Sequence, residues 1–247
     1  MNAVIDTILN HRTYRDFQPD VVIPEQALAA ILACAQQAPS WMNGQHYSII
    51  HVTDTQLRDK IVALQPRNPQ IGTCSAFLIF VADLYRAKLA SDACDGSFDA
   101  ASMPDTMFTM TVDTSLAAQN ALIAAESLGY GTCPIGGLRL VAPELVALLN
   151  LPLYTFPLFG LCIGKPSVEM RIKPRLPQSA VVHQNQYQTQ SLAEQLAQYE
   201  QTMLDFNEVR EKLPFRQKIS HYYQQSFAPR NTALLRRQGF LSTFEEE

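Results

Sequence analysis

The chain has 247 residues with a formal net charge of −4, and 47% of its residues are hydrophobic and 17% charged. This composition supplies a sizeable core and excludes global disorder, while the acidic balance argues against a general nucleic-acid-binding protein. No basic segment followed by an apolar run opens the sequence, and no window of about 18 uninterrupted apolar residues occurs, so we expect neither a signal peptide nor a membrane span.

Predicted elements of the N-terminal half alternate between helix and strand. We expect a short helix over 3–10, a helix from Pro24 to about residue 37, a loop over 39–45, a strand over 47–52, a helix over 55–64 and a strand over 76–82. Pro24 suits the first turn of a helix, where its missing N–H costs nothing. The run 76–82 is apolar throughout, which is typical of a strand buried on both faces.

The C-terminal half begins with a segment, 91–104, that shows no clear period and is interpreted as an irregular excursion with the character of a mobile flap. The longest helix is predicted over 106–128 and ends at Gly129. Because that helix is rich in small residues and poor in charge, we expect it to be buried nearly all round, either in the core or across a dimer interface. Further elements are strands over 130–135 and 156–164 and helices over 143–149, 191–205 and 215–227.

Five cysteines are scattered along the chain, and no two form a C-x-x-C motif. They are Cys34, Cys74, Cys94, Cys133 and Cys162. We therefore expect no disulfide framework, and, because the histidines also lack metal-ligand spacing, no metal site. The expected location is a reducing cytoplasm.

Two basic clusters lie far apart in this acidic chain, one over 11–15 and the other over 173–175. Pro174 favours an extended Lys173, so the side chains of Lys173 and Arg175 would point to one side and could clamp a phosphate. The alternative is two solvated surface clusters. A glycine-rich segment, 129–137, departs from G-x-G-x-x-G at Pro134 and offers a bare backbone at Gly136 and Gly137, unless it is a simple turn.

Several ordered motifs together resemble the flavin-dependent nitroreductase family, and specifically the group of oxygen-insensitive NADPH nitroreductases and NADPH–flavin oxidoreductases. The motifs are His-Arg-Thr-Tyr-Arg over 11–15 and the segments 38–45, 124–131, 134–139, 156–164 and 173–177. The resemblance implies an α+β fold with a mostly antiparallel sheet packed with helices, and an intertwined homodimer that binds FMN at its interface. It divides the chain into an FMN-binding core, 1–177, and a C-terminal extension, 178–247, that wraps the core or the partner subunit.

The resemblance also assigns residues to the bound FMN. Arg15, Lys173 and Arg175 would hold the phosphate, and His11, Arg12 and Thr13 would line the ribityl chain and the pyrimidine end of the ring. Ser40 would reach the flavin from the other subunit, the Gly136 amide would donate toward N5, and Gly137 and Arg139 would lie alongside. Asn68 stands where relatives tend to carry a glutamine. Arg210 and Lys212, interleaved with Glu208 and Glu211, occupy the region that contacts the 2′-phosphate of NADPH in relatives.

The activity implied is a ping-pong transfer of hydride from NADPH or NADH, through FMN, to nitroaromatics, quinones or free flavins. The flavin carries the chemistry, so no protein acid or base is assigned as catalytic. The expected partners are small-molecule acceptors and a second subunit, with neither nucleic acid nor membrane. Two alternatives stay open: a flavin-consuming or dehalogenating member of the same fold, and a module that binds or senses FMN without turnover.

Overall fold

The computed structural model describes residues 2–241. The chain divides into two compact units: the first runs as far as Met170 and resumes at Arg230, and the second comprises Arg171–Pro229. Each unit is described by itself. Among residues 2–241 no helix is both long and apolar enough to span a membrane.

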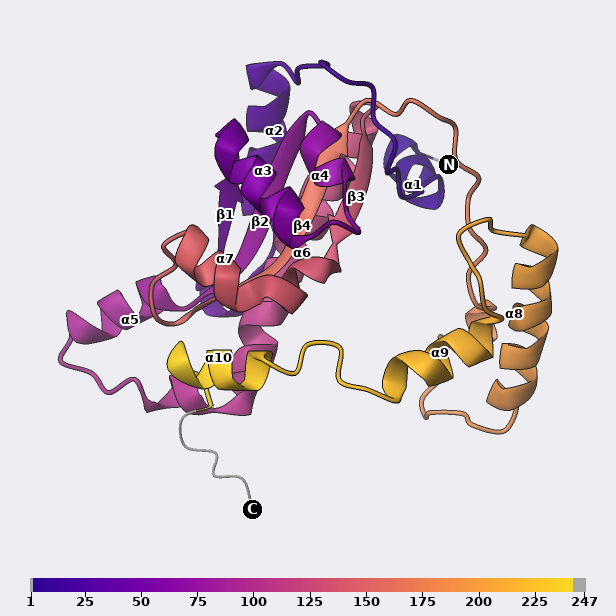
Figure 1. Ribbon diagram of the computed structural model, residues 1–247. Helices are drawn as coiled ribbons and strands as arrows, with labels where there is room; N and C mark the ends of the chain where they lie inside the picture. Colours follow the sequence, from indigo (N-terminus) through magenta and orange to yellow (C-terminus); the bar gives the residue numbers. More distant parts are fainter. Residues whose placement is uncertain (1, 242–247) are drawn as a thin grey trace. The chain divides into compact units, whose positions relative to one another are not determined.

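A four-stranded antiparallel sheet forms the centre of the first unit (Figure 1). The strands are β1 (Tyr47–His51), β2 (Ala76–Asp83), β3 (Gly131–Ile135) and β4 (Thr155–Gly164), in the order β1-β2-β4-β3. Every residue of β2 is buried, as the apolar run over 76–82 predicts, and the strand ends in a buried aspartate, Asp83. The predicted combination of helices with a mostly antiparallel sheet is confirmed.

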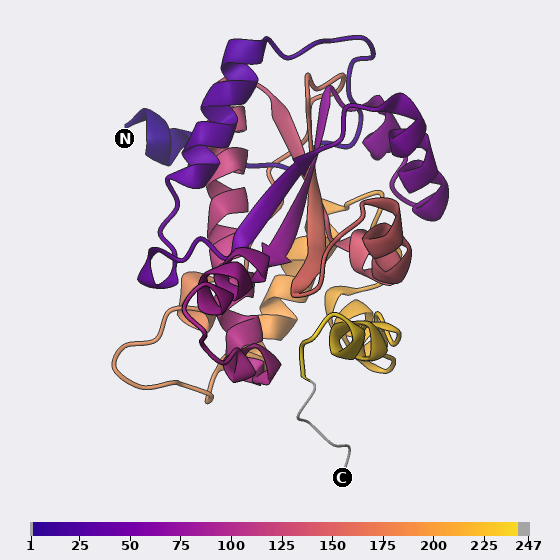
Figure 2. The same ribbon diagram turned by 90° about the vertical axis from the view of Figure 1, so that its left-hand side faces the viewer.

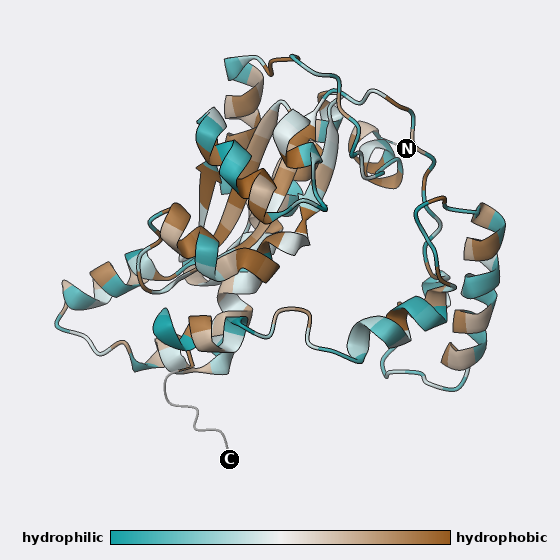
Figure 3. Ribbon diagram, in the orientation of Figure 1, coloured by the Kyte–Doolittle hydropathy of each residue, from teal (hydrophilic) through white to brown (hydrophobic). Residues whose placement is uncertain are grey.

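Helices cover both faces of the sheet (Figure 2). Alternate residues of β2 point to opposite faces, so Leu78 and Phe80 pack with α2 (Glu25–Gln36) and α6 (Pro104–Ser127), while Phe77 and Ile79 join the cluster on the other face. That second cluster includes residues of α3 (Thr55–Leu64), α4 (Gln70–Thr73) and α7 (Ala142–Leu148). Figure 3 shows the strands mostly in the colours of hydrophobic residues, as a sheet covered on both faces requires.

Local signals explain where several helices begin and end. Asn2 accepts a hydrogen bond from the Ile5 amide at the start of α1 (Ala3–Leu9), and Asp54 does the same for Leu57 at the start of α3. Gly129, with φ of +80°, follows the last turn of α6, which confirms the predicted stop.

Helix α6 is not buried all round within the single chain, so the core alone does not cover it, and its burial across a dimer interface stays a prediction. Its inner face buries Met110, Thr114, Ala117 and further small residues. Phe108, Val112 and Leu116, spaced four residues apart, are exposed, and Phe108 retains 69% of its accessible surface. Helix α6 therefore carries large apolar side chains along a face that is exposed among the described residues.

Segment 91–104 is more regular than we expected. Its first residues end a helix, α5 (Tyr85–Asp92), and a 3-10 helix, η2 (Asp99–Ser102), forms shortly before α6. No residue of α5 is buried, so its sequence lacks the apolar period by which a helix is recognised.

The second unit contains η4 (Gln178–Ala180), α8 (Leu192–Phe206) and α9 (Phe215–Tyr223), close to the predicted helices. Tyr199 of α8 meets Phe215 of α9 edge to face at 4.9 Å, and Glu200 binds Arg216. After this unit, α10 (Asn231–Arg237) returns to the first unit, where Leu234 and Phe240 are buried.

Candidate functional site

The first basic cluster lies directly beside β3. The amide of Tyr14 donates to the Thr132 carbonyl at 2.9 Å, and Thr13 forms a parallel bridge with Thr132. Because Gly136 and Gly137 follow the end of the same strand, the fold brings segment 11–15 and the glycine pair to one strand of the first unit.

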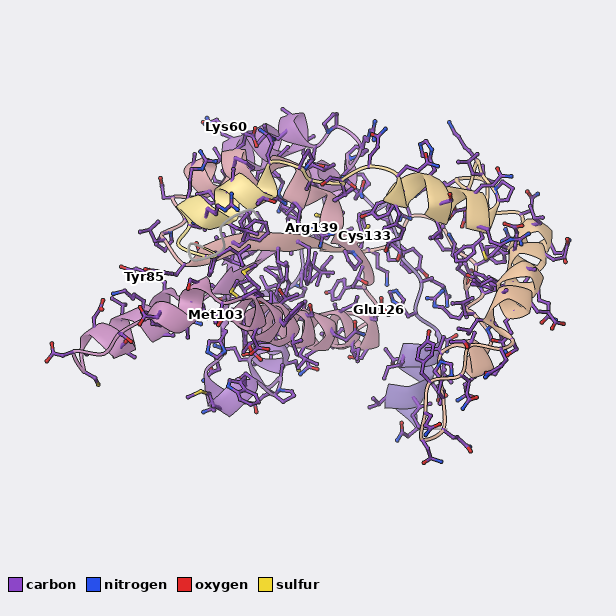
Figure 4. All side chains as sticks on the ribbon, turned by 90° about the horizontal axis from the view of Figure 1, so that it is seen from below. Lys60, Tyr85, Met103, Glu126, Cys133 and Arg139 are labelled. Atoms are coloured by element: carbon purple, nitrogen blue, oxygen red, sulfur yellow. The ribbon has the colours of Figure 1, made fainter. Side chains whose placement is uncertain are left out.

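His11 contacts a partly buried carboxylate. Its Nδ1 atom lies 2.8 Å from Oε1 of Glu126, near the end of α6 opposite Met103 (Figure 4). The hydroxyl of Thr132 donates to the same carboxylate oxygen at 2.6 Å. The carboxylate from α6 thereby orients the imidazole, and Thr132 of β3 holds that carboxylate in turn. Neither contact was anticipated from the sequence.

Arg12 is ordered by neighbours on its own segment. Its Nε donates to the Tyr14 hydroxyl at 3.0 Å and its Nη1 to the Asn10 carbonyl at 3.0 Å, while Nη2 lies 3.6 Å from the exposed carboxylate of Glu169. Arg15 is exposed, and within residues 2–241 no hydrogen bond or ion pair involves its guanidinium. The segment therefore presents one fixed cation and one that is available to an anion.

The two glycines differ in what surrounds them. A Cβ placed on Gly136 would have no atom within 4 Å, whereas one on Gly137 would lie 2.8 Å from Gln65 Oε1 and 3.0 Å from Asn68 Nδ2. Asn68 donates to Gln65 and accepts from Gln70. Asn68 thus lies against Gly137, as expected of two residues assigned to the same ligand. Its side-chain amide forms a hydrogen-bonded cluster with those of Gln65 and Gln70, two residues to which the sequence analysis assigned no role.

A hollow of about 280 Å³ opens beside Gly136 and Arg139. The rest of its lining comes from α6 and the sheet: Ser115, Ala118, Gln119, Leu122, Pro134, Phe159 and Leu161. A mostly apolar wall with a few polar groups and an open backbone suits a flat aromatic ligand. The residues present therefore fit the ring of a flavin.

Ser40 belongs to a loop that is attached to the middle of α6. Its hydroxyl accepts from the Gln45 amide at 3.1 Å, and the next amide, that of Trp41, donates to Asp113 at 3.0 Å. Asp113, one of the few charged residues in this small-residue helix, is the sequence signal for the attachment, and the sequence analysis assigned it no role.

Lys173, Arg175, Arg210 and Lys212 all belong to the second unit. There Lys173 lies 3.0 Å from Glu211 and 3.7 Å from Glu208, and Arg175 donates to the carbonyl of Lys173. Burial is the largest influence on the pKa of Glu211 and raises it, but hydrogen bonds from Lys218 and Lys173 outweigh burial and leave that pKa lowered. Arg15 lies in the other unit, so the expected phosphate clamp remains a prediction.

Comparison with known proteins gives the family of the chain. The nitroreductase family model matches residues 8–165, and the model of the nitroreductase family C-terminal domain matches 173–243. An FMN reductase [NAD(P)H] of Bacillus subtilis is 39% identical over 246 residues, which cover 97% of this chain and 98% of the relative. An oxygen-insensitive NADPH nitroreductase of Salmonella typhimurium is 38% identical, with 83% of each chain covered.

Solved structures agree with the sequence comparison. NfrA2 of B. megaterium has a TM-score of 0.93 at 36% identity, with all of both chains covered. The NADPH:FMN oxidoreductase of Vibrio harveyi, complexed with NAD+, has a TM-score of 0.88 at 32% identity and covers 97% of this chain and 100% of its own. With matched family models over most of its length and relatives this similar, the chain belongs to the nitroreductase family.

Proposed function

We propose that the protein is an FMN-dependent NAD(P)H oxidoreductase that reduces nitroaromatics, quinones or free flavins. The observation that carries the proposal is the open backbone at Gly136, which lines an apolar hollow at the end of the strand that also holds segment 11–15. Relatives named FMN reductase, NADPH nitroreductase and NADPH–flavin oxidoreductase support it.

FMN, when bound, supplies the acceptance and release of hydride, and the chain supplies position and charge. The Gly136 amide would donate toward N5, and Arg12, fixed by Tyr14 and Asn10, would supply a cation at the pyrimidine end. Fixed donors of this kind stabilise developing negative charge at little reorganisation cost. His11 and Thr13 would line the ribityl side.

The phosphate is assigned to Arg15, Lys173 and Arg175, and the exposed, unpartnered guanidinium of Arg15 among the described residues supports its part. Arg210 and Lys212 stay our candidates for the 2′-phosphate of NADPH. The division into a core, 1–177, and an extension, 178–247, is retained as part of the proposal.

The proposed working form is a homodimer. Exposed apolar side chains lie along α6 at Phe108, Val112 and Leu116, and α1 exposes four more: Val4, Ile5, Ile8 and Leu9. Covering such a surface with a second copy removes apolar area from water. In that dimer the loop of Ser40 would reach the partner's flavin. A reducing cytoplasm is part of the same proposal, supported by five cysteines that form no disulfide among residues 2–241.

An anaerobic titration tests the function directly. The purified protein is loaded with FMN, and its visible spectrum is recorded as NADPH, or separately NADH, is added. We expect loss of the yellow colour with the donor and its return when a nitroaromatic is added. Retained FMN that neither nicotinamide bleaches would overturn the reductase and leave an FMN-binding module.

A further inference from the structure

A buried ionisable pair joins α6 to the loop over 40–46. Asp113 is 2% exposed, and its Oδ2 atom lies 2.8 Å from Nδ1 of His46, which is itself buried. The inner face of α6 around Asp113 is otherwise made of Met110, Thr114 and Ala117. A carboxylate buried in such surroundings persists only when its oxygens are satisfied.

The loop satisfies both oxygens. The Trp41 amide donates to Oδ1 at 3.0 Å, and the His46 amide donates to Oδ2 at 3.3 Å. One side chain therefore binds the backbone near both ends of the loop as well as the imidazole. Removing it would leave two amides and a ring without their acceptor.

The loop that Asp113 holds is strained. Met42, Asn43 and Gln45 have φ values of 44°, 57° and 51°, in the left-handed region that non-glycine residues rarely adopt. Such a conformation persists only where neighbouring contacts determine it. The ring of His46 also packs directly against Gly44 of the loop. A Cβ on Gly44 would lie 2.3 Å from the Cε1 atom of His46, so the ring leaves no space for a side chain there.

The result is an apolar projection of fixed shape. Trp41 is 67% exposed and Met42 82% exposed, although both have large apolar side chains. They are adjacent to Ser40, the residue assigned to the partner's flavin. An aromatic and a thioether side chain on a fixed loop can form a wall against which a flat acceptor packs.

We propose that Asp113 and His46 are a positioning pair that sets the conformation of loop 40–46 and, through Trp41 and Met42, determines the KM for the electron acceptor. The inference rests on the proposed function. Neither residue touches the acceptor. The hydride step depends on groups elsewhere, so a loosened loop lowers the affinity for the acceptor and leaves kcat nearly unchanged.

The only tryptophan of the chain is Trp41, so its fluorescence reports this loop alone. Asp113→Asn and His46→Ala should lower the steady-state anisotropy of Trp41 and increase its quenching by acrylamide. His46→Asn should restore both, because an asparagine Nδ2 can donate from nearly the position of the imidazole Nδ1. The matched control is Asp105→Asn, an exposed aspartate on the same helix, which should leave the fluorescence unchanged.

Kinetics supply the second measurement, at saturating NADPH and varied nitroaromatic. We expect His46→Ala to raise the KM by about fivefold with kcat within about twofold, and His46→Asn to return the KM close to the wild-type value. Circular dichroism establishes that each variant is folded. If Asp113→Asn does not fold, the two His46 variants decide the matter alone.

A second-site test uses the contact between Gly44 and the ring. Gly44→Ala should raise the KM in the wild-type background, where it displaces the imidazole. In the His46→Asn background, where the far part of the ring is gone, the same change should have little effect.

Unchanged anisotropy and unchanged KM in His46→Ala would overturn the inference. Anisotropy is measured on the protein without donor or acceptor, so it does not depend on turnover. A fall in anisotropy in a protein that never bleaches with nicotinamide would reject the proposed function and the kinetic role together, and would leave Asp113 as the anchor of the loop.

Discussion

Glu126 lies 2.8 Å from Nδ1 of His11, although 115 positions separate the two residues in the sequence. The contact ties the C-terminal turn of α6 to segment 11–15. The hydroxyl of Thr132 donates to the same oxygen and so holds the carboxylate in place. A hydrogen-bonded carboxylate of this kind fixes both the orientation and the tautomer of a histidine.

Replacing Glu126 by Gln should therefore weaken FMN binding without altering a residue that contacts FMN. The loss of a charge-assisted hydrogen bond predicts about a tenfold increase in Kd. Quenching of FMN fluorescence on titration with apoprotein measures it. Glu25→Gln, at an exposed position of α2, is the control. Equal affinities for the two variants would contradict a role for this pair.

Combining Arg15→Ala with Arg175→Ala should reduce FMN affinity by about a hundredfold or more, because each arginine is assigned a charge-assisted bond to phosphate. Riboflavin, which lacks the phosphate, should bind the variant and the wild type alike. Arg237→Ala removes an exposed guanidinium on α10 and serves as the control. Unaltered FMN retention in the double variant would reject the assignment of the phosphate site.

Elements whose signal is local could be predicted from the sequence. Helix α3 was predicted with its observed ends, because Asp54 caps it and one face is apolar. Strand β2 was predicted because its run of apolar residues needs no partner to be recognised. Helix α5 was missed because it buries nothing, and α10 because two buried side chains, Leu234 and Phe240, do not reveal which surface covers them.

The candidate site likewise contains residues that local motifs predict and residues that they do not. The resemblance named His11 and Gly137 from contiguous motifs, but their neighbours come from elsewhere in the chain. Glu126 reaches His11 only because α6 ends beside β3, and Asn68 reaches Gly137 only because of the path of the chain before α4. Contacts of this range depend on the tertiary fold, which no local pattern contains.

Glu211 should make stability of the second unit depend on pH. Its folded-state pKa lies below its ordinary value of 4.5, so its ion pairs contribute fully above that pH and are lost as the pH falls through the folded-state pKa. Lys173 and Lys218 are partly exposed and screened by solvent, so the contribution is small, about 0.5 kcal/mol. Glu211→Gln should therefore lower Tm at pH 7 and have a smaller effect near pH 3.

Thermal unfolding at the two pH values checks this, with Glu194→Gln on α8 as the control. A Tm difference between wild type and Glu211→Gln that persists unchanged at the lower pH would show that the ion pairs are not its cause.

A charge on the exposed face of α6 should break the proposed homodimer. Val112→Glu puts a carboxylate in the middle of the apolar stripe, where burial without a partner is costly. Light scattering coupled to size-exclusion chromatography should then give the mass of one chain. Val22→Glu, at an exposed position outside the helices, should leave the dimer intact. A dimer that survives Val112→Glu would place the interface elsewhere.

Substitutions at Gly136 and Gly137 allow an effect on FMN binding to be distinguished from an effect on the stability of the fold. Gly136→Ala adds a methyl group to open space, and φ at this position is not positive, so Tm should stay within about 1 °C. The same methyl group narrows the hollow beside it, and FMN affinity should fall by about tenfold. Gly137→Ala instead meets the amides of Gln65 and Asn68 and should lower Tm by a few degrees. Calorimetry of the apoproteins together with FMN titration distinguishes the two substitutions. An FMN affinity unaffected by Gly136→Ala would show that the hollow beside Gly136 does not bind the flavin.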